Sequence, residues 1–346
     1  MYAPGMGAPG MGAPPALFRT RDYHNYGVEF SPFVEGRLAV ASSQFFGIVG
    51  NGKQFVLQLQ ADGTVQVQRA FETNDGLFDC CWNELNEHQL ASASGDGSIK
   101  LWDCNTRDNF PIRNFHEHQQ ECASVDWNLV SKNTFLSASW DGTVKLWDPM
   151  VPQSRMTFAE HSGSVYNARW SPRHPGRFVT CSADATVKVF DTNQGRSTAT
   201  IRAHEGEVLA VDWNKYNEFA FVSGSVDRTM RFWDLRRINQ PTQVLFGHQY
   251  AIRRLKCSPH DEHVVGTVSY DMTSCIWNTA REDALVLKGE QHTEFVMGID
   301  FSLFRPGQVA TCSWDEHVCI FNIAGGPPPR IPPPPKRPSG GALPLR

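Results

Sequence analysis

The sequence predicts an all-β protein, a seven-bladed β-propeller whose N-terminal strand closes the last blade. The first observation is a ten-residue pattern that recurs six times, from SGDGSIKLWD at 94–103 to SWDEHVCIFN at 313–322. The second is its spacing, because the turn aspartates of successive copies lie 45, 43, 43, 44 and 44 residues apart. The third is that each repeat contains four short strand-like runs separated by turns. Self-similarity at this period, with four strands per unit, is typical of propeller blades.

The repeat at 161–202 illustrates how one blade is expected to form. SVYNARW alternates and ends at a Ser-Pro pair, RFVTCS is a second strand, TVKVF is a third strand beyond an Asp turn, and STATIR is a fourth. A single blade cannot bury both of its faces. The blades are therefore expected to stack side by side in a ring.

The first blade is divergent. Stepping 45 residues back from Asp96 reaches Asn51, and its Asn-Gly pair predicts a tight turn between two strands. The runs YGVEFSP at 26–32 and RLAVASS at 37–43 fit the first two strands of this blade. This unit and the six clear copies together give seven blades.

The last blade lacks its own outer strand, because the chain runs into prolines after Asn322. We expect residues 17–21 to supply it. In an alignment on the inner strands, Leu17-Phe18 occupies the place of Val244-Leu245 in an earlier blade. The N-terminal strand would thereby remove the open sheet edges.

These patterns divide the chain into three segments. Residues 17–324 form the propeller. Residues 1–16 are a Gly/Pro/Met-rich arm with almost no side chain able to build a core, and residues 325–346 are a basic, Pro-rich tail. Both end segments are predicted to be disordered. For the tail, a solvated segment is favoured over a ligand for an aromatic-lined adaptor domain.

Composition argues against several classes of function. The net charge is −4 and the isoelectric point is near 6.3, which disfavours general binding to nucleic acid or to membranes. No apolar run approaches the roughly 18 residues that span a bilayer, and no charged N-terminal segment precedes an apolar run. We predict neither direct membrane insertion nor secretion. The nine scattered cysteines, with no CxxC pair, indicate reduced, mostly core thiols of a cytosolic protein, without a metal site or cofactor.

Polar residues recur at fixed offsets within the repeats. A histidine stands 23 residues before the turn aspartate in five repeats, Ser or Thr stands four and two residues before it, and an aromatic residue stands six after it. The set resembles a catalytic triad, but enzymes do not normally carry five equal active sites in one domain. We therefore predict a structural network that pairs buried polar groups, and no enzymatic activity.

The predicted network has one aspartate in each of six repeats, with a histidine and a tryptophan in most of them. Phe190 and Phe321 replace the tryptophan in two repeats, so their networks are expected to be shorter. The network residues are Asp96, Asp141, Asp184, Asp227, Asp271 and Asp315, His118, His161, His204, His248 and His292, and Trp102, Trp147, Trp233 and Trp277. The histidine, the turn aspartate and the terminal Trp-Asp pair are those of the WD-repeat family. This resemblance covers residues 17–324 and implies the fold, while it says little about function.

A candidate binding surface lies where the loops that enter the innermost strands meet the turns between second and third strands. The three residues after each histidine position, taken over all seven blades, include six acids and no Lys or Arg. The residues before the turn aspartates include Trp140, Tyr270 and Trp314, at positions expected to face solvent. This combination favours a basic, partly apolar partner, for example a cationic amphipathic helix. The alternative is a solvated acidic rim.

Several runs outside the generic repeat columns resemble the family of peroxisomal import receptors for the type-2 targeting signal. They are NDGLFD (74–79), SWDGTVKLWDP (139–149), YAIRR (250–254), HTEFVMGIDFS (292–302) and RLAVASSQFFGIVGNG (37–52). The resemblance implies a soluble receptor that binds the N-terminal helical signal of matrix cargo proteins. It further implies a co-receptor that caps the complex, a peroxisomal docking complex, and cycling between the cytosol and the peroxisome matrix.

The same resemblance assigns site residues. Family members carry acids at the positions of Glu121 and Glu207, which are implicated in meeting the basic residue of the signal. Other acids would extend the rim, and the aromatics would take the apolar side of the helix. Together with the acids and aromatics read directly from the loop positions, the candidate signal-binding residues are Asp75, Glu121, Glu207, Glu294, Trp140, Tyr270, Trp314 and Arg253.

Two alternatives stay open. Arg253 and its neighbour Arg254 either brace the acids internally or touch the signal. The fold by itself also permits another function, a WD-repeat scaffold or the substrate-recognition subunit of a complex such as a ubiquitin ligase.

Overall fold

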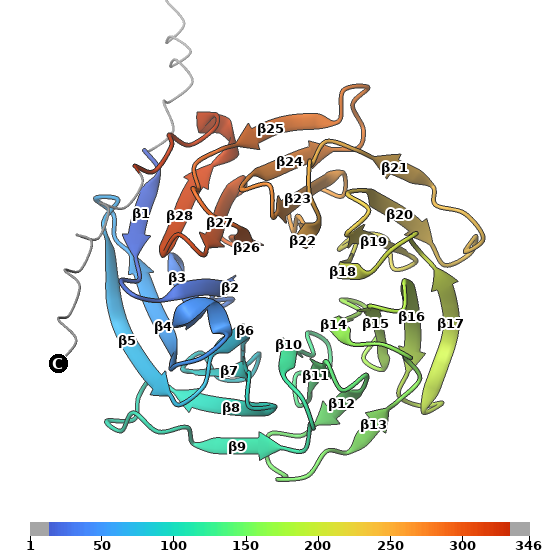
Figure 1. The fold of residues 1–346 in the computed structure, drawn as a ribbon, viewed down its shortest axis with the longest axis horizontal. Coiled ribbons are helices and arrows are strands. Elements are labelled where there is room, and N and C mark those ends of the chain that lie inside the picture. The colour runs from blue at the N-terminus through green and yellow to red at the C-terminus, as the bar shows by residue number, and fades with distance from the viewer. Residues whose placement is uncertain (1–13, 333–346) are drawn as a thin grey trace, which may run out of the picture.

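The computed structural model describes residues 14–332. In this part of the chain, seven four-stranded antiparallel sheets stand around a central channel, so the predicted seven-bladed propeller is confirmed (Figure 1). Blade 1 consists of β2 to β5, each later blade takes the next four strands, and blade 7 consists of β26 to β28 with β1. None of the helices in this part of the chain is long and apolar enough to cross a membrane.

The innermost strand of each blade lines the channel. These strands are β2 (His24–Phe30), β6 (Leu77–Trp82), β10 (Cys122–Trp127), β14 (Val165–Trp170), β18 (Val208–Trp213), β22 (Ile252–Cys257) and β26 (Val296–Phe301). The second strands are β3 (Arg37–Ser43), β7 (Gln89–Ser94), β11 (Phe135–Ser139), β15 (Arg177–Ser182), β19 (Ala220–Ser225), β23 (Val264–Ser269) and β27 (Gln308–Ser313).

The third strands carry the aromatic that follows each turn aspartate. They are β4 (Gly52–Leu59), β8 (Ser98–Asp103), β12 (Val144–Trp147), β16 (Thr186–Asp191), β20 (Met230–Asp234), β24 (Ser274–Asn278) and β28 (His317–Asn322). The outer strands are β5 (Val65–Thr73), β9 (Arg113–His116), β13 (Met156–Phe158), β17 (Arg196–Arg202), β21 (Gln243–Leu245), β25 (Leu285–Gly289) and β1 (Ala16–Arg19). Two short 3-10 turns, η1 (Phe45–Gly47) and η2 (Ile323–Gly325), complete the described elements.

The hydrophobic core lies between the blades. One cluster joins Cys81 and Ala91 of blade 2 to Trp127, Phe135 and Trp147 of blade 3, and all five side chains are buried. Because every sheet packs both faces against its neighbours, most of its second and third strands are buried on both sides. All nine cysteines are free and eight are buried, as expected of core thiols.

The ring closes as the sequence predicts. Strand β1 pairs with β28 in antiparallel register, with Leu17 opposite Cys319 and Phe18 opposite Val318, and the two strands lie side by side in Figure 1. The equivalent positions of blade 5 are held by Val244 and Leu245 on β21. The N-terminal strand thus covers an edge that would otherwise expose unpaired backbone groups.

The first blade differs from expectation at its turn. Asn51 does not form a tight turn, because β3 ends at Ser43 and β4 begins at Gly52. The eight intervening residues form a longer loop that contains η1, and its ends are joined by a hydrogen bond from the Gln44 N–H to the Asn51 carbonyl. Phe45 and Phe46 adopt positive φ values of 44° and 56°. The insertion relative to other blades explains why the repeat pattern is weak here.

The ends of the propeller extend slightly beyond the predicted boundaries. Ala16 lies in β1, and Ile331 is 3% exposed with its N–H donating to the Gln291 carbonyl at 2.8 Å. Arg330 forms an ion pair with Glu290 at 2.5 Å. Residues 1–13 of the predicted arm and 333–346 of the predicted tail lie outside the described residues, so the disorder of both segments stays a prediction.

Candidate functional site

The network of histidine, aspartate, hydroxyl and indole groups runs inside the blades. In blade 3, His118 Nδ1 lies 2.9 Å from Asp141 Oδ2, and His118 Nε2 lies 2.7 Å from Ser137 Oγ. The Trp147 indole N–H donates to the same hydroxyl at 2.7 Å. His118 is only 2% exposed. The hydroxyl is therefore occupied from two sides and is not poised as a nucleophile.

The same contacts recur in other blades. His204 and His248 make matching contacts in blades 5 and 6, each with an indole at the far end. In blades 4 and 7 the contacts of His161 and His292 end at a Thr hydroxyl, because phenylalanine replaces the tryptophan. The aspartates resist protonation: burial raises the pKa of Asp141, but hydrogen bonds from His118 and Thr143 outweigh burial and hold that pKa well below its usual range.

Blade 2 satisfies its turn aspartate differently. Thr73 stands where the other blades carry histidine, and Asp96 instead accepts a hydrogen bond from Lys100 Nζ at 3.0 Å and from the Ser98 hydroxyl at 2.6 Å. The Trp102 indole still donates to Ser92 Oγ at 2.8 Å. A lysine thus replaces the histidine as the partner of the carboxylate, and the blade keeps its geometry.

We call the surface on which the inner strands begin the entry face and the surface on which they end the exit face. The entry face carries a continuous aromatic arc over blades 3, 2, 1, 7 and 6. Neighbouring ring centroids in this arc lie 4.8 to 6.1 Å apart. In order, the arc consists of Trp140, Phe78, Tyr26, Trp314, Phe295 and Tyr270.

The three predicted aromatics do not face solvent equally. Trp140 is 38% exposed, whereas Tyr270 and Trp314 are half-buried. The physical reason is a small cluster beneath them, formed by the buried side chains of Tyr26, Phe78 and Met297. The sequence analysis missed Tyr26 and Phe78, because both lie inside inner strands, where an aromatic residue is ordinarily part of the core.

The first-blade loop extends the arc with apolar surface. Phe46 stacks on His24 with ring centroids 3.8 Å apart and contacts Trp314 at 5.4 Å. Phe45 is 59% exposed and Ile48 is 85% exposed. The run FFGIV in a loop was a signal for such a surface, because loop tips seldom expose consecutive large apolar side chains.

The loops that carry Glu121 and Glu207 lie on the entry face, as predicted. Their backbone carbonyls accept hydrogen bonds from the N–H groups of Trp140 and Val226, each at 3.0 Å, which ties the two sets of loops together. The Glu207 carboxylate accepts from the Tyr166 hydroxyl at 2.7 Å. Glu121 is half-buried, and its carboxylate has no hydrogen bond or ion pair with any of residues 14–332. Neither acid has a cationic partner within this range.

The other two predicted acids, Asp75 and Glu294, have different surroundings. Asp75 is half-buried and accepts from the Gly76 N–H at 2.7 Å. Glu294 is exposed, and its backbone carbonyl accepts from the Ser313 hydroxyl at 3.1 Å. Both lie in loops of the entry face, on blades 2 and 7.

The two arginines of the YAIRR run have different surroundings. Arg254 is 4% exposed and pairs with Asp79 inside the channel, while Arg169 Nη2 lies 3.8 Å from the same carboxylate. Arg253 is half-buried and forms no ion pair with the described residues. Arg254 therefore braces Asp79 and none of the predicted rim acids.

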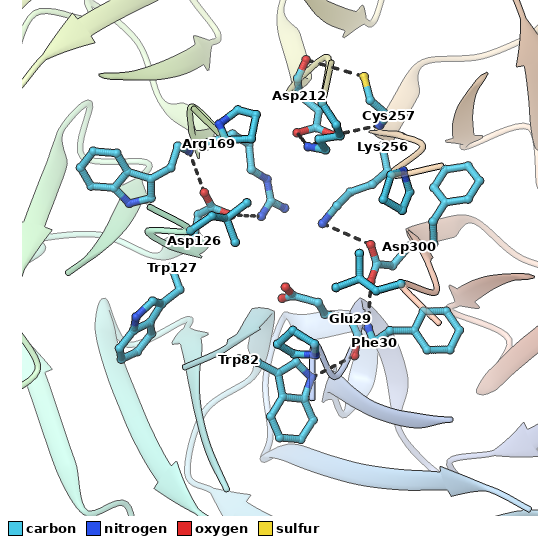
Figure 2. A pocket seen from close by; sticks show the side chains of 18 of the residues that line it. Glu29, Phe30, Trp82, Asp126, Trp127, Arg169, Asp212, Lys256, Cys257 and Asp300 are labelled. Atoms are coloured by element: carbon cyan, nitrogen blue, oxygen red, sulfur yellow. Dashed lines mark hydrogen bonds and ion pairs between the residues drawn. The ribbon is translucent and has the colours of Figure 1, made fainter. Parts of the chain in front are cut away.

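The exit face contains a pocket of about 260 Å³ at the channel mouth. The residues next to last in the inner strands supply most of its charged lining, as Figure 2 shows: Glu29, Asp126, Arg169, Asp212, Lys256 and Asp300. Three of the acids join neighbouring blades, since Asp126, Asp212 and Asp300 accept from the N–H groups of Trp170, Cys257 and Phe30 at 2.7 to 2.8 Å. This ring of charged residues was not predicted, although the sequence has a charged residue at the next-to-last position of the inner strand in six blades.

None of these clusters suggests a resident metal. Among residues 14–332 no group of three or more His, Cys, Asp and Glu side chains could hold a metal ion.

Comparison with known proteins agrees with the fold. The family model for the WD domain, G-beta repeat, matches residues 62–103, 109–148, 152–191, 195–234 and 239–278. A peroxisomal targeting signal 2 receptor of Dictyostelium discoideum is 57% identical over 83% of this chain and 91% of its own length. Those of Mus musculus and Saccharomyces cerevisiae are 50% and 33% identical, covering 86% and 89% of this chain and 94% and 99% of their own lengths. The chain thus belongs to the WD-repeat family and, within it, to the family of peroxisomal targeting signal 2 receptors.

Proposed function

We propose that this protein is an import receptor that binds the N-terminal type-2 targeting signal of peroxisomal matrix proteins on its entry face. The observation that carries the proposal is the combination of aromatic and acidic groups on that face. The aromatic arc occupies blades 3, 2, 1, 7 and 6, and carboxylates without cationic partners lie on blades 3 and 5 at Glu121 and Glu207. An amphipathic helix with one apolar and one basic side is the complement of such a surface.

The aromatic groups and the carboxylates of the entry face contribute differently to the binding free energy. Burying aromatic surface contributes about 25 cal/mol for each Å² removed from water, so the arc supplies most of the affinity. An ion pair at a partly exposed carboxylate contributes only about 0 to 1 kcal/mol. Glu121 and Glu207 therefore act chiefly on the rate of encounter and on the discrimination against signals without a basic residue.

A short helix over the arc leaves apolar surface uncovered beside it. The first-blade loop exposes Phe45, Ile48 and Val49 at 59%, 85% and 65%. We assign this surface to the co-receptor that the resemblance implies, because a cap over the helix would bury it. Delivery to a peroxisomal docking complex, and cycling between the cytosol and the peroxisome matrix, complete the proposed function.

The decisive experiment is peptide binding with charge reversal on the entry face. Fluorescence anisotropy would follow a labelled type-2 signal peptide as it binds the full chain and the Glu121→Arg/Glu207→Arg variant, with a scrambled peptide for comparison. We expect the variant to lose at least about tenfold in affinity, because two attractive contacts become repulsive. Its thermal midpoint should fall by no more than a few degrees, since neither carboxylate has a cationic partner among the described residues and the hydrogen bond lost is that from the Tyr166 hydroxyl to Glu207.

A matched control variant carries the same change of charge in loops of the exit face. Glu87→Arg/Glu262→Arg alters two exposed acids in loops that follow the inner strands. This variant should bind the signal peptide with wild-type affinity. Normal binding by the entry-face variant, or equal loss in both variants, would contradict the proposed site.

A further inference from the structure

The pocket at the exit face has features that the proposed function does not use. It is lined by five acids and three bases, with apolar walls between them. We name it the exit-mouth pocket and define its charged lining as Glu29, Glu84, Asp126, Arg169, Asp212, Lys215, Lys256 and Asp300.

The bases of the pocket are already paired within it. Arg169 Nη1 lies 2.7 Å from Asp126 Oδ1, and Lys215 Nζ lies 2.8 Å from Asp212 Oδ1. Lys256 Nζ lies 3.3 Å from Asp300 Oδ1.

Two acids remain after this pairing. Glu84 lies 3.6 Å from Lys132, which stands outside the pocket. The Glu29 carboxylate has no hydrogen bond or ion pair with any residue of the described range. The pocket thus has one carboxyl group without a partner.

Glu29 is placed to receive a cation. Figure 2 shows its carboxylate directed into the open space between the Asp126–Arg169 pair and the Lys256–Asp300 pair. Its backbone carbonyl accepts from the Trp82 indole N–H at 3.2 Å, which fixes the strand behind it. Burial favours the neutral form of this carboxyl and raises its pKa above the ordinary value, so a cation bound beside it would favour the ionised form.

The rim of the pocket is held rigidly by contacts between blades. The Asn128 side chain donates to the Pro175 carbonyl and the Tyr216 hydroxyl to the Pro259 carbonyl, each at 2.8 Å. His260 Nε2 lies 2.8 Å from the Ser302 carbonyl. A preformed rim lowers the entropy cost of binding.

Apolar side chains surround the charged centre. Leu129 and Leu303 line the pocket and are 43% and 48% exposed. Leu85, Tyr216 and Phe304 continue this surface in neighbouring exit-face loops, with exposures of 64%, 44% and 43%. The chemistry that fits is a cation with apolar groups on both sides.

We propose that the exit-mouth pocket is a second binding site, which takes an arginine or lysine side chain from an extended segment of a partner protein. The cationic group meets Glu29, and flanking apolar residues of the segment contact Leu129 and Leu303. The volume of about 260 Å³ lies just below the roughly 300–1,000 Å³ typical of small-molecule pockets, so it suits one long side chain. The site lies on the opposite face from the proposed signal site and does not depend on it.

The test uses the full chain and two capped tripeptides, acetyl-Leu-Arg-Leu-amide and the same peptide with neutral citrulline in place of arginine. The indole N–H signals of Trp82 and Trp127, which line the pocket, report binding by two-dimensional NMR. We expect the arginine peptide to shift these two signals and the citrulline peptide to bind at least about tenfold more weakly, because a buried charged hydrogen bond is lost.

Two matched variants locate the cation. Glu29→Gln should weaken binding of the arginine peptide at least about tenfold, whereas Glu84→Gln, with the same change of charge in the same pocket, should stay within about twofold. Both should bind the signal peptide normally, so failure here is distinguishable from failure of the proposed function.

Several outcomes would overturn the proposal. They are equal binding of the two tripeptides, no shift up to about 10 mM arginine peptide, unchanged affinity in Glu29→Gln, or shifts confined to the indoles of Trp140 and Trp314. The comparison of the two peptides on the wild-type chain stands even where a substitution perturbs folding.

Discussion

Both mouths of the channel carry carboxylates, but these groups have different partners at the two ends. On the exit face, Asp212 accepts from the Cys257 N–H and from Lys215 Nζ, each at 2.8 Å. On the entry face, Glu121 has no partner among the described residues, and Glu207 has only the hydroxyl of Tyr166. Acidic side chains such as Asp212 thus link two blades at the exit face, whereas Glu121 and Glu207 at the entry face remain available to a ligand.

Position along the inner strand accounts for this difference. A carboxylate next to the strand end reaches the backbone of the neighbouring blade, because adjacent inner strands converge at the channel. An acid in the loop before the strand points away from that backbone. Glu29 stands at the same offset in blade 1 and is the exception, because its carboxyl accepts no backbone N–H of the described residues. For the other acids named here the role follows from the offset within the repeat, and the predictions below test that rule.

The largest expected effect is that of acid on the turn aspartates. Burial raises their pKa, but hydrogen bonds from His, Ser or Thr partners outweigh burial and hold it below the ordinary value. Groups with a depressed pKa stabilise the folded state above the unfolded pKa near 3.8, and this stability is lost as the pH falls. Six such groups together should lower the urea midpoint steeply below about pH 4. The residues are Asp96, Asp141, Asp184, Asp227, Asp271 and Asp315.

Glu29 should give the opposite slope. Burial raises its pKa, and Asp300 adds to this, although Lys256 and Arg169 act against it and Asp126 adds a smaller increase. Its contribution to stability is present below the unfolded pKa and is lost as the pH rises through the raised value. Urea midpoints should therefore fall as the pH rises above the ordinary value near 4.5 in the wild-type chain, and fall less in Glu29→Gln. Parallel curves for the two proteins would contradict the assignment.

Among single substitutions, Asp212→Ala should be the most destabilising. It removes the acceptor of the Cys257 N–H and leaves Lys215 without its partner, at a cost of about 3 kcal/mol in the free energy of unfolding. Urea denaturation measures the change. Glu205→Ala, an exposed acid of the entry face, should change the free energy by less than about 0.5 kcal/mol. Similar losses in both variants would break the distinction between the faces.

Trp140→Ala should act on binding more than on folding. The side chain is 38% exposed at one end of the aromatic arc, and loss of a central aromatic contact typically costs about 2 kcal/mol of binding, roughly thirtyfold in Kd. Anisotropy with the signal peptide measures it. Phe110→Ala removes a 79% exposed aromatic in the loop between β8 and β9 and should leave binding unchanged.

The smallest expected effect is that of Tyr166→Phe. The variant loses the hydroxyl that donates to Glu207, at a cost of about 1 kcal/mol in stability. The freed carboxylate should bind the signal peptide slightly more tightly, by less than about threefold, since a partly exposed ion pair contributes little. Titration of the peptide at two salt concentrations tests this, and weaker binding would indicate that Tyr166 itself orients the acid.

Much of the fold was predictable because the repeat encodes it locally. The turn aspartates, the β1 closure and the blade count follow from spacing, and the register of Leu17 on β28 matches that prediction. The sequence did not predict the loop at 44–51. An insertion there breaks the fixed spacing between turns by which the other blades were located. The entry-face acids were placed on the correct loops. The sequence did not reveal the whole arc, because Tyr26 and Phe78 lie in inner strands and are buried beneath the more exposed aromatics.

The pairing of β1 with β28 has a consequence for biosynthesis. The Thr20 hydroxyl donates to the Glu316 carbonyl, across a sequence separation of 296 residues. At about 5 to 20 residues per second, the first strand made on the ribosome waits roughly 15 to 60 seconds for its partner. A chain that ends before β28 leaves the ring open and the edge of β1 unpaired. The closed propeller can therefore form only after β28 has been synthesised, so the first strand of the chain is among the last to pair.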